Sequence, residues 1–146
     1  MSKFWKKIIL GYVLVFVFFV LDRIIKYWLL QPEARGAGIL TLSKNQGIAF
    51  GIPLQGLFLY ILVGLILAGL FYLALKFWQK KNTGLHLATV LIIVGALSNL
   101  IDRFKFGAVI DYIDLRIWPV FNLADCMIVI GVVMWVLTDK VKKKRN

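Results

Sequence analysis

Acidic and amide side chains that could do chemistry gather in one polar stretch, residues 99–125, between two runs without charge. The residues of interest are Asn99, Asp102, Arg103, Asp111, Asp114, Asn122 and Asp125. The flanking runs, 89–97 and 127–137, contain no acid or base. Acids at the edge of a long apolar segment lose hydration, so each needs a partner or a chemical task. We therefore take residues 99–125 as the candidate active site.

Asp111 and Asp125 are the two acids best suited to catalysis. Asp125 follows Asn122 by three residues at the start of an apolar helix, so the two share a face. Two close carboxylates do not both ionise easily, and one keeps a proton. The ionised acid can activate a water while the other protonates or polarises a scissile carbonyl. Because such a pair titrates jointly, neither acid receives a fixed role. The alternative is that one or both acids only pair with Arg103, Arg116 or Lys105 at the membrane interface.

The other polar residues have both structural and functional interpretations. Asn99 and Arg103 are four residues apart, so they share a helix face and could hold a peptide backbone. The alternative is an interfacial anchor formed by Asp102 with Arg103. Asp22 and Lys26 are also four residues apart, which predicts a structural salt bridge.

Other kinds of catalytic site have little support in the sequence. His86 is the only histidine and is expected near a helix end far from the acids, which argues against Ser-His-Asp or Cys-His catalysis. Cys126 follows Asp125 on a helix and points about 100° away from it, so we interpret it as a packing thiol. The chain has no metal-binding or nucleotide-binding motif, and we expect neither a metal nor another cofactor.

The elements that must position these residues are predicted to be membrane-spanning helices. The chain is 61% hydrophobic, against about 45–50% apolar residues in ordinary soluble domains. A bilayer core takes roughly 20 helical residues. We predict an all-α membrane protein, one polytopic domain over residues 1–146, with spans at about 8–30, 56–77, 84–101 and 120–138.

The distribution of charge predicts the orientation. The net charge of +11 comes from lysines and arginines outside the apolar segments or at their ends, which favours lipid headgroups over nucleic acid. Eleven of these bases fall on the side of both termini and seven on the other, so we expect both termini in the cytoplasm. Six of the seven acids fall on the opposite side, which places the chemistry at the extracytoplasmic face. The first apolar segment is long and lacks an A-x-A cleavage site, so we expect it to be a retained span.

Two further segments have a predicted structure. Residues 31–56 contain several glycines and prolines, and within them 39–43 is a plausible short strand. This segment could pair its backbone with an extended peptide or could be an ordinary connecting loop, and Asn45 is either a turn residue or a ligand to a substrate backbone. In the second span, Gly64, Ala68 and Gly69 predict close helix packing.

Five short motifs resemble the lipoprotein signal peptidase (signal peptidase II) family. They occur in the family's order over nearly the whole chain: DRIIK at 22–26, NQGIAFG at 45–51, GALSNLIDR at 95–103, VIDYID at 109–114 and FNLADC at 121–126. The resemblance departs in two ways: Val94 and Ser98 stand where the family often has glycines, and Cys126 stands where serine or alanine is common. Neither change removes a catalytic group.

The resemblance implies a fold and a function. It implies four helices in the bacterial plasma membrane, both termini cytoplasmic, and an extracytoplasmic cradle between helices 1 and 2. It implies an aspartyl protease that cleaves prolipoproteins just before the diacylglyceryl-modified cysteine, works without a cofactor as an expected monomer, and is inhibited by globomycin. By motif, the catalytic residues are Asp111 and Asp125. The substrate-binding residues are Asn45, Asn99, Arg103 and Asn122. The supporting residues are Asp22, Lys26, Asp102 and Asp114.

Two other classes of function remain as alternatives. A small transporter or proton-pathway protein would use the acids as relay groups and needs polar residues along a continuous path. The second and third apolar segments lack such residues toward the inner side. A non-catalytic membrane assembly subunit would leave the paired acids without a task. The peptidase interpretation accounts for the largest part of the sequence.

Overall fold

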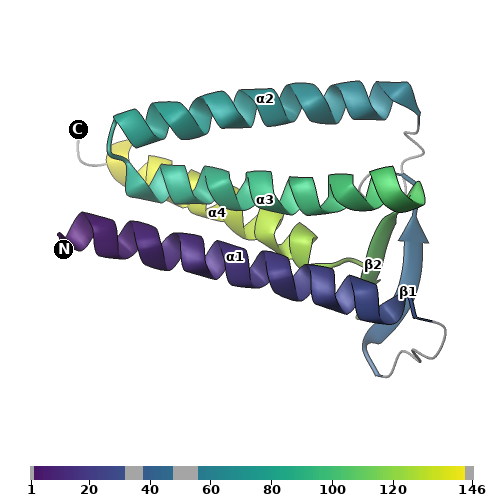
Figure 1. The fold of residues 1–146 in the computed structure, drawn as a ribbon. Helices are drawn as coiled ribbons and strands as arrows, with labels where there is room; N and C mark the ends of the chain where they lie inside the picture. The colour runs from purple at the N-terminus through teal and green to yellow at the C-terminus, as the bar shows by residue number, and fades with distance from the viewer. Residues whose placement is uncertain (1, 32–37, 48–55, 144–146) are drawn as a thin grey trace.

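The computed structural model describes residues 2–31, 38–47 and 56–143. In chain order its elements are α1 (Lys3–Leu29), β1 (Leu40–Asn45), α2 (Leu57–Gln79), α3 (Thr83–Phe106), β2 (Val109–Ile113) and α4 (Leu123–Lys143). The helices run lengthwise, and the two strands lie together at one end of them (Figure 1). The described part of the chain is therefore mostly helical, with one small sheet.

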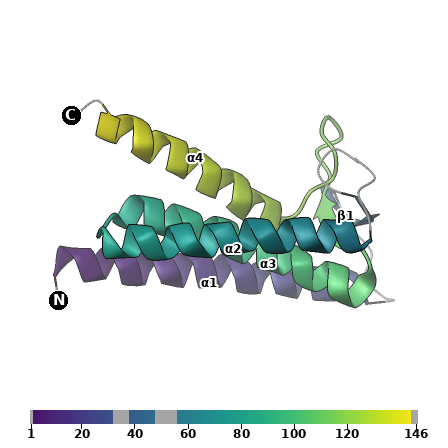
Figure 2. The same ribbon diagram turned by 90° about the horizontal axis from the view of Figure 1, so that it is seen from above.

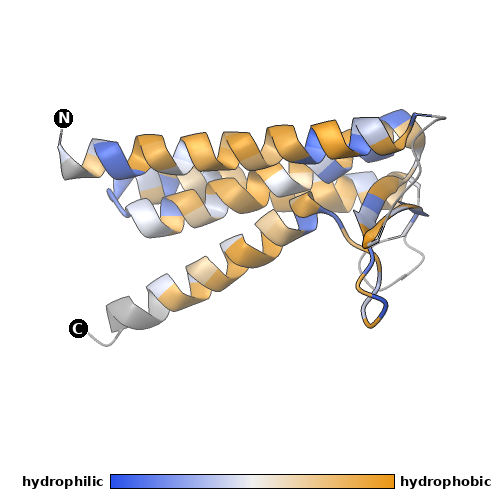
Figure 3. Cartoon of the chain, turned by 90° about the horizontal axis from the view of Figure 1, so that it is seen from below, coloured by the Kyte–Doolittle hydropathy of each residue, from blue (hydrophilic) through white to orange (hydrophobic). Residues whose placement is uncertain are grey.

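Three of the helices have the length and apolarity needed to cross a membrane. These are Phe4–Leu29 of α1, Leu57–Gln79 and Thr83–Phe106. The apolar part of α4, Leu123–Thr138, is shorter. Apolar residues cover the outer surfaces of the helices, whereas polar residues gather near the sheet and at the helix ends (Figure 3). The fold agrees with the membrane protein predicted from the sequence, and the fourth span stays a prediction.

Helix α3 occupies the centre of the bundle and packs against α1, α2 and α4. One apolar cluster joins Val15 of α1, Leu91 of α3 and Met127 of α4, and a second joins α2 to α3 around Leu67 and Ile93. Helix α4 starts beside the bundle near the sheet and diverges from α2 toward the C-terminus (Figure 2). The two helices are therefore farther apart at that end than beside the sheet.

Two glycines permit the close approach of α3 and α4. A Cβ at Gly95 would lie 2.6 Å from the carbonyl oxygen of Ala124, and a Cβ at Gly131 would lie 2.8 Å from the carbonyl oxygen of Ala88. Small residues at such crossings let two backbones pack directly. The expectation for Gly64 and Gly69 was wrong, because a Cβ at either position meets nothing within 4 Å.

The sheet pairs β1 with β2 in antiparallel register. Ser43 lies opposite Asp111 and Asn45 lies opposite Val109. The strand expected at 39–43 is confirmed as a strand, with bounds Leu40–Asn45. Strand β2 had not been predicted, although its sequence VIDYI is rich in β-branched and aromatic residues, which favour strands. Its formation fixes the position of Asp111.

His86 lies buried at the opposite end of the bundle from the sheet. Its Nδ1 lies 2.9 Å from the carbonyl oxygen of Ala74 and its Nε2 lies 2.7 Å from the hydroxyl of Tyr12. Because a carbonyl oxygen can only accept, Nδ1 carries the proton and Nε2 accepts from the tyrosine. His86 thus ties α1, α2 and α3 together. Its place near the start of α3 agrees with the predicted position near a helix end.

Candidate active site

The start of α4 places Asp125 through a reciprocal helix cap. The side-chain Oδ1 of Asn122 accepts the backbone N–H of Asp125 at 2.8 Å, and Oδ2 of Asp125 accepts the backbone N–H of Asn122 at 3.2 Å. This exchange satisfies two of the N–H groups that a helix start leaves without partners. The first turn of a helix also favours a negative charge. The sequence FNLAD therefore builds the helix start and positions the carboxylate in one step.

Strand β2 places Asp111 on the other side of Asn122. Asp111 is 2% exposed, and its carboxylate accepts two side-chain amides: Nδ2 of Asn122 at 2.6 Å and Nδ2 of Asn45 at 3.1 Å. Asn122 consequently donates to both aspartates, through its side chain to Asp111 and through its backbone to Asp125. The predicted pair is thus brought together by one shared asparagine.

Asn99 of α3 completes the set of amides around the pair. Its Nδ2 donates to Oδ1 of Asp125 at 2.8 Å, and its Oδ1 accepts Nδ2 of Asn122 at 3.1 Å. Its Oδ1 also accepts the ammonium of Lys26 at 3.1 Å, which fixes the amide orientation. Because a cation holds the oxygen side, the Asn99 N–H group is directed at Asp125.

The surroundings of Asp111 favour its protonated form. Burial, and then the charge of Asp125, raise its pKa to about 6, while the amides of Asn45 and Asn122 act in the opposite direction. An ordinary aspartate titrates near pH 4. A pair that retains one proton up to about pH 6 offers a general base and a general acid in the same site. This is the charge state that the sequence interpretation required.

Asp22, Lys26 and Asp102 form a separate buried ionic cluster. The Lys26 ammonium lies 2.9 Å from Asp22 and 2.7 Å from Asp102. Arg23 makes a second ion pair with Asp102. The predicted Asp22–Lys26 bridge is confirmed, and the Asp102–Arg103 anchor was wrong. Adjacent residues on a helix point about 100° apart, and the partners of Asp102 come instead from α1.

This ionic cluster also holds β2 and α4 in place. Asp22 accepts the hydroxyl of Tyr112 at 3.0 Å and the backbone N–H of Ala124 at 3.2 Å. Asp102 accepts the backbone N–H of Ile110 at 3.3 Å. Ser98, which departs from the family's usual glycine, donates to Asp22 at 2.6 Å. The cluster therefore supports the two elements that carry Asp111 and Asp125 without joining the pair itself.

Arg103 lies beside the pair but makes no ion pair within the described residues. Its Nη2 donates to the carbonyl oxygen of Gly47 at 3.0 Å, and its buried Nε has no hydrogen-bond partner in the described part of the chain. Asn45 binds the same turn, because its Oδ1 accepts the backbone N–H of Gly47 at 3.0 Å. Asn45 is thus a turn residue, as one of its two predicted roles required, and it is also a partner of Asp111. Its role as a ligand to a substrate backbone stays a prediction.

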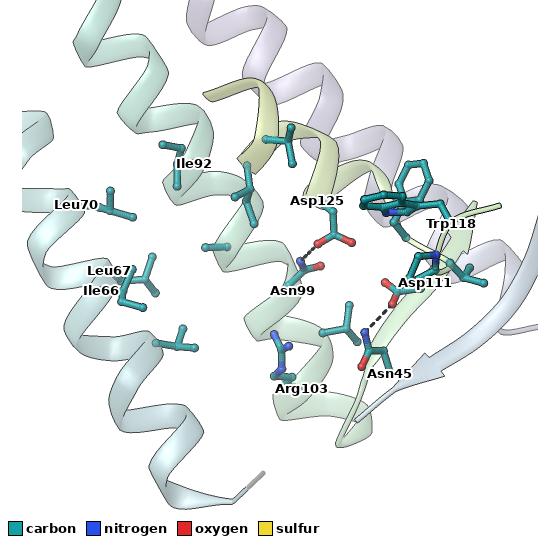
Figure 4. Close-up of a pocket in the computed structure, with 18 residues that line it drawn as sticks. Asn45, Ile66, Leu67, Leu70, Ile92, Asn99, Arg103, Asp111, Trp118 and Asp125 are labelled. Carbon is teal, nitrogen blue, oxygen red and sulfur yellow. Dashed lines mark hydrogen bonds between the residues drawn. The ribbon is translucent and has the colours of Figure 1, made fainter. Parts of the chain in front are cut away.

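A cavity of about 480 Å³ contains both aspartates. Asn45, Asn99 and Arg103 line its polar end together with Asp111 and Asp125 (Figure 4). Its long wall is apolar and comes from α2, α3 and α4: Val63, Ile66, Leu67, Leu70, Ile92, Ala96, Ile128 and Val129. The sequence analysis had not singled out this apolar wall. Apolar faces on three helices give no local motif, because only the packing reveals that they face one cavity.

Four points remain: Trp118, which was not predicted, the predicted residues Asp114 and Cys126, and the expected absence of a metal. Trp118 lines the same cavity and was missed by the sequence analysis, since a lone tryptophan after a loop resembles an interfacial anchor. Asp114 lies outside the cavity, where its carboxylate accepts the backbone N–H of Arg116 at 2.7 Å. Cys126 is a half-buried free thiol. Within the described residues, no group of three His, Cys, Asp or Glu side chains could hold a metal ion.

Apolar helices surround a cavity that holds one buried and one half-buried carboxylate, Asp111 and Asp125, each bound by amides. This combination is that of a membrane protein with a hydrolase-like site. The profile of the family described as signal peptidase (SPase) II matches residues 14–139. The chain therefore belongs to the signal peptidase II family, whose members are membrane peptidases.

Similar proteins agree with this assignment over most of their length. The lipoprotein signal peptidase of Halothermothrix orenii is 38% identical over 135 residues, covering 86% of this chain and 92% of its own. That of Syntrophomonas wolfei is 42% identical over 139 residues, covering 87% and 92%. A bacterial membrane enzyme solved by the in meso method at 2.3 Å resolution superposes with a TM-score of 0.78 at 29% identity, covering 93% of this chain and 90% of that one.

Proposed function

We propose that this protein is an aspartyl endopeptidase that cleaves prolipoproteins just before the diacylglyceryl-modified cysteine and so releases the signal peptide. The observation that carries the proposal is the Asn122 bridge. One asparagine donates to both Asp111 and Asp125, and both acids line the same cavity. The relatives' name, lipoprotein signal peptidase, supports the choice of substrate.

The reaction follows from the shared proton of the pair. The ionised aspartate removes a proton from a water molecule, which attacks the scissile carbonyl carbon. The protonated aspartate donates its proton to the carbonyl oxygen, which gives a tetrahedral gem-diol. The gem-diol collapses when the first aspartate passes the proton taken from water to the leaving nitrogen and the second aspartate takes back a hydroxyl proton. The C–N bond breaks, and the starting charge state of the pair is restored. The pair titrates as a unit, so either acid can hold the proton at the start. Asn99 and Asn45 keep the two carboxylates oriented through the 2.8 Å and 3.1 Å hydrogen bonds described above.

The cavity has the chemistry that this substrate requires. Its apolar wall on α2, α3 and α4 suits a hydrophobic signal peptide and the acyl chains on the cysteine. Asn45, Asn99, Arg103 and Asn122 supply polar groups at the reacting end. The Nε of Arg103 has no hydrogen-bond partner among the described residues, so it would bind a substrate carbonyl oxygen. Asp22, Lys26 and Asp102 support the site, and Asp114 shapes the nearby loop.

The proposal includes a place and an orientation. We assign the protein four spans in the bacterial plasma membrane, both termini in the cytoplasm, and the two-stranded cradle with the aspartates at the extracytoplasmic face. We expect it to act as a monomer, without metal or cofactor, and to be inhibited by globomycin. A proton-pathway role has less support. Such a role needs a continuous path of polar groups, and Thr89 is the buried polar residue described between His86 and Ser98 on α3. Its hydroxyl donates to the carbonyl oxygen of Leu85 in the same helix at 2.7 Å, so it is not directed along a path.

The test is cleavage of a diacylglyceryl-modified prolipoprotein by purified protein in detergent. We expect activity in the unmodified enzyme and none on the same substrate without the lipid. Asp111→Asn and Asp125→Asn should each lower kcat by at least about a thousandfold, because each removes a proton-transfer group. Both variants should keep the melting temperature within a few degrees.

Lys105→Gln, an exposed residue, is the control and should keep normal activity. A near-normal rate in either folded aspartate variant would show that this pair does not perform the reaction. An inactive unmodified enzyme would bring the proton-pathway alternative forward.

A further inference from the structure

The chain between β2 and α4 forms a closed loop, which we call the finger and define as residues 114–120. Its neck is tied by Ile113 and Phe121, whose backbones exchange hydrogen bonds at 2.7 and 3.2 Å. Asp114 adds a bond from its backbone N–H to the carbonyl oxygen of Ile39 at 2.8 Å, and its carboxylate accepts the N–H of Arg116. The base of the finger is therefore held by the sheet on both sides.

The tip of the finger is apolar and exposed. Ile117 is 90% exposed, Trp118 57% and Leu115 45%. Arg116 lies among them with φ at +63°, in the left-handed region that residues with side chains rarely adopt. Three large apolar side chains on one short loop form a surface that a protein in water would normally cover.

The position of the finger indicates what covers it. It projects sideways from the bundle on the side of α4, near the sheet (Figure 2). Trp118 and Pro119 line the cavity, so the finger borders the space that holds the aspartates. Exposed apolar residues of α4, such as Val129 and Val133, continue the same surface toward the other end of the bundle. With the helices across a bilayer, a sideways projection at this end lies at headgroup and upper acyl-chain depth.

The residue types also match that depth. Tryptophan is enriched at the membrane–water interface, because its ring is apolar and its N–H is polar. An arginine at the same level can reach lipid phosphates while its stem stays among apolar groups. Isoleucine and leucine would bury their exposed surface among acyl chains. A second protein copy would need a partner surface that tolerates the cationic Arg116 at its centre.

We propose that the finger inserts into the leaflet on its own side of the membrane, with Ile117, Leu115 and Trp118 among the upper acyl chains and Arg116 at the phospholipid phosphates. The inserted finger holds the cavity at the depth from which a lipid-anchored substrate arrives. Insertion is independent of catalysis, whereas its effect on turnover rests on the proposed peptidase function.

The first experiment measures depth. A bimane label is placed at Ile117→Cys in a Cys126→Ser background, and the protein is reconstituted into nanodiscs of phosphatidylcholine and phosphatidylglycerol. Val133→Cys on α4 is the control for a site in lipid, and Lys44→Cys on the exposed face of β1 is the control for water. Dibrominated lipids should quench the label at 117 when the bromines are near the headgroup, and soluble iodide should quench it less than the label at 44.

The opposite pattern, with iodide quenching at 117 equal to that at 44, would overturn the proposal. So would a label at 117 that is shielded from both quenchers while crosslinking to a second copy. Neither result depends on peptidase activity, so failure of the finger and failure of the proposed function are distinguishable.

The second experiment measures how substitutions in the finger change turnover in nanodiscs and in detergent. Ile117→Asp should lower kcat/KM for a lipidated substrate in nanodiscs by about tenfold, because a charge replaces a lipid-inserted side chain. Ile117→Leu should behave as the unmodified enzyme. In detergent, where the bilayer no longer sets the depth, the deficit of Ile117→Asp should largely disappear. An equal deficit in both media would indicate a role in local folding and would refute the positioning role.

Discussion

Two clusters of buried carboxylates lie side by side in this protein, and they are built in opposite ways. Asp22 and Asp102 contact the ammonium of Lys26 directly, and Asp102 also contacts Arg23. Asp111 and Asp125 receive hydrogen bonds from amides, and none of their described partners is a cation. The same residue type is thus neutralised by opposite charge in one cluster and solvated by neutral dipoles in the other.

The difference shows how one fold can hold acids bound by cations beside acids whose surroundings suit the proposed proton transfer. A carboxylate that faces a cation within 3 Å stays ionised, so it has no proton to give. A carboxylate surrounded by amides and near a second carboxylate can retain a proton, as the raised pKa of Asp111 shows. Asn99 joins the clusters, because it accepts from Lys26 and donates to Asp125. The ionic cluster therefore orients the reactive one without adding a cation to it.

The prediction with the largest expected effect concerns Lys26, the cation shared by Asp22 and Asp102. Lys26→Met should leave two buried carboxylates without their shared partner and destabilise the fold by about 3–5 kcal/mol. Thermal unfolding in detergent measures the effect, with the exposed Lys105→Met as the control. Asp111→Asn should leave the melting temperature nearly unchanged while abolishing cleavage. If Lys26→Met melts normally and only loses activity, the ionic cluster belongs to the reactive site and the contrast is wrong.

A second prediction concerns the packing of α4, the helix that contacts both carboxylate clusters. Gly95→Ala places a Cβ against the backbone of Ala124, so α4 must shift at a cost of about 1–3 kcal/mol. Because Ala124 is bonded to Asp22 and adjoins Asp125, both stability and kcat should fall. Gly69→Ala is the matched control, since its Cβ meets nothing within 4 Å. Unaltered cleavage in a stable Gly95→Ala enzyme would show that the contact is not tight.

The smallest test concerns the pH dependence of the reactive pair. Because Asp111 holds its proton to about pH 6, kcat/KM should fall as the pH rises above that value. The amide of Asn45 stabilises the ionised carboxylate, so Asn45→Ala should raise the pKa of Asp111 and move this descending limb to higher pH. The limb is measured on a lipidated substrate, with Leu42→Ala on the same strand as the control. A limb that moves to lower pH would contradict the assigned hydrogen bond.

The sequence predicted the parts of the structure that depend on local spacing. Asp22 and Lys26 are one helical turn apart, so their ion pair follows from the helix alone. Asn122 and Asp125 share the first turn of α4 for the same reason. The apolar segments predicted helices whose bounds differ from the observed ones by a few residues, although the apolar part of α4 is shorter than the span expected at 120–138.

The features that the sequence analysis did not predict depend on contacts between segments far apart in the chain. Asp102 binds Arg23 and Lys26 of α1. The sequence analysis had considered Arg103 as its partner instead, because Arg103 is the next residue in the chain. Strand β2 exists because β1 pairs with it across more than 60 residues of sequence, and its five residues alone were too short to indicate a strand. The place of Trp118 at the cavity likewise depends on how the loop folds back at Phe121. Such partners are specified by the whole packing and not by any window of sequence.

The shared cap at the start of α4 has a consequence for biosynthesis. Asp111 lies in β2, but Asp125 lies in α4, the final helix of the described chain, and Asn122 immediately precedes that helix. While the protein is being made, a chain that has emerged only through β2 carries one lone acid without its second acid or its shared asparagine. The site can assemble only after that helix has inserted and formed its first turn. Under the proposed aspartyl mechanism, a half-made chain is therefore unable to cleave neighbouring proteins at the insertion machinery.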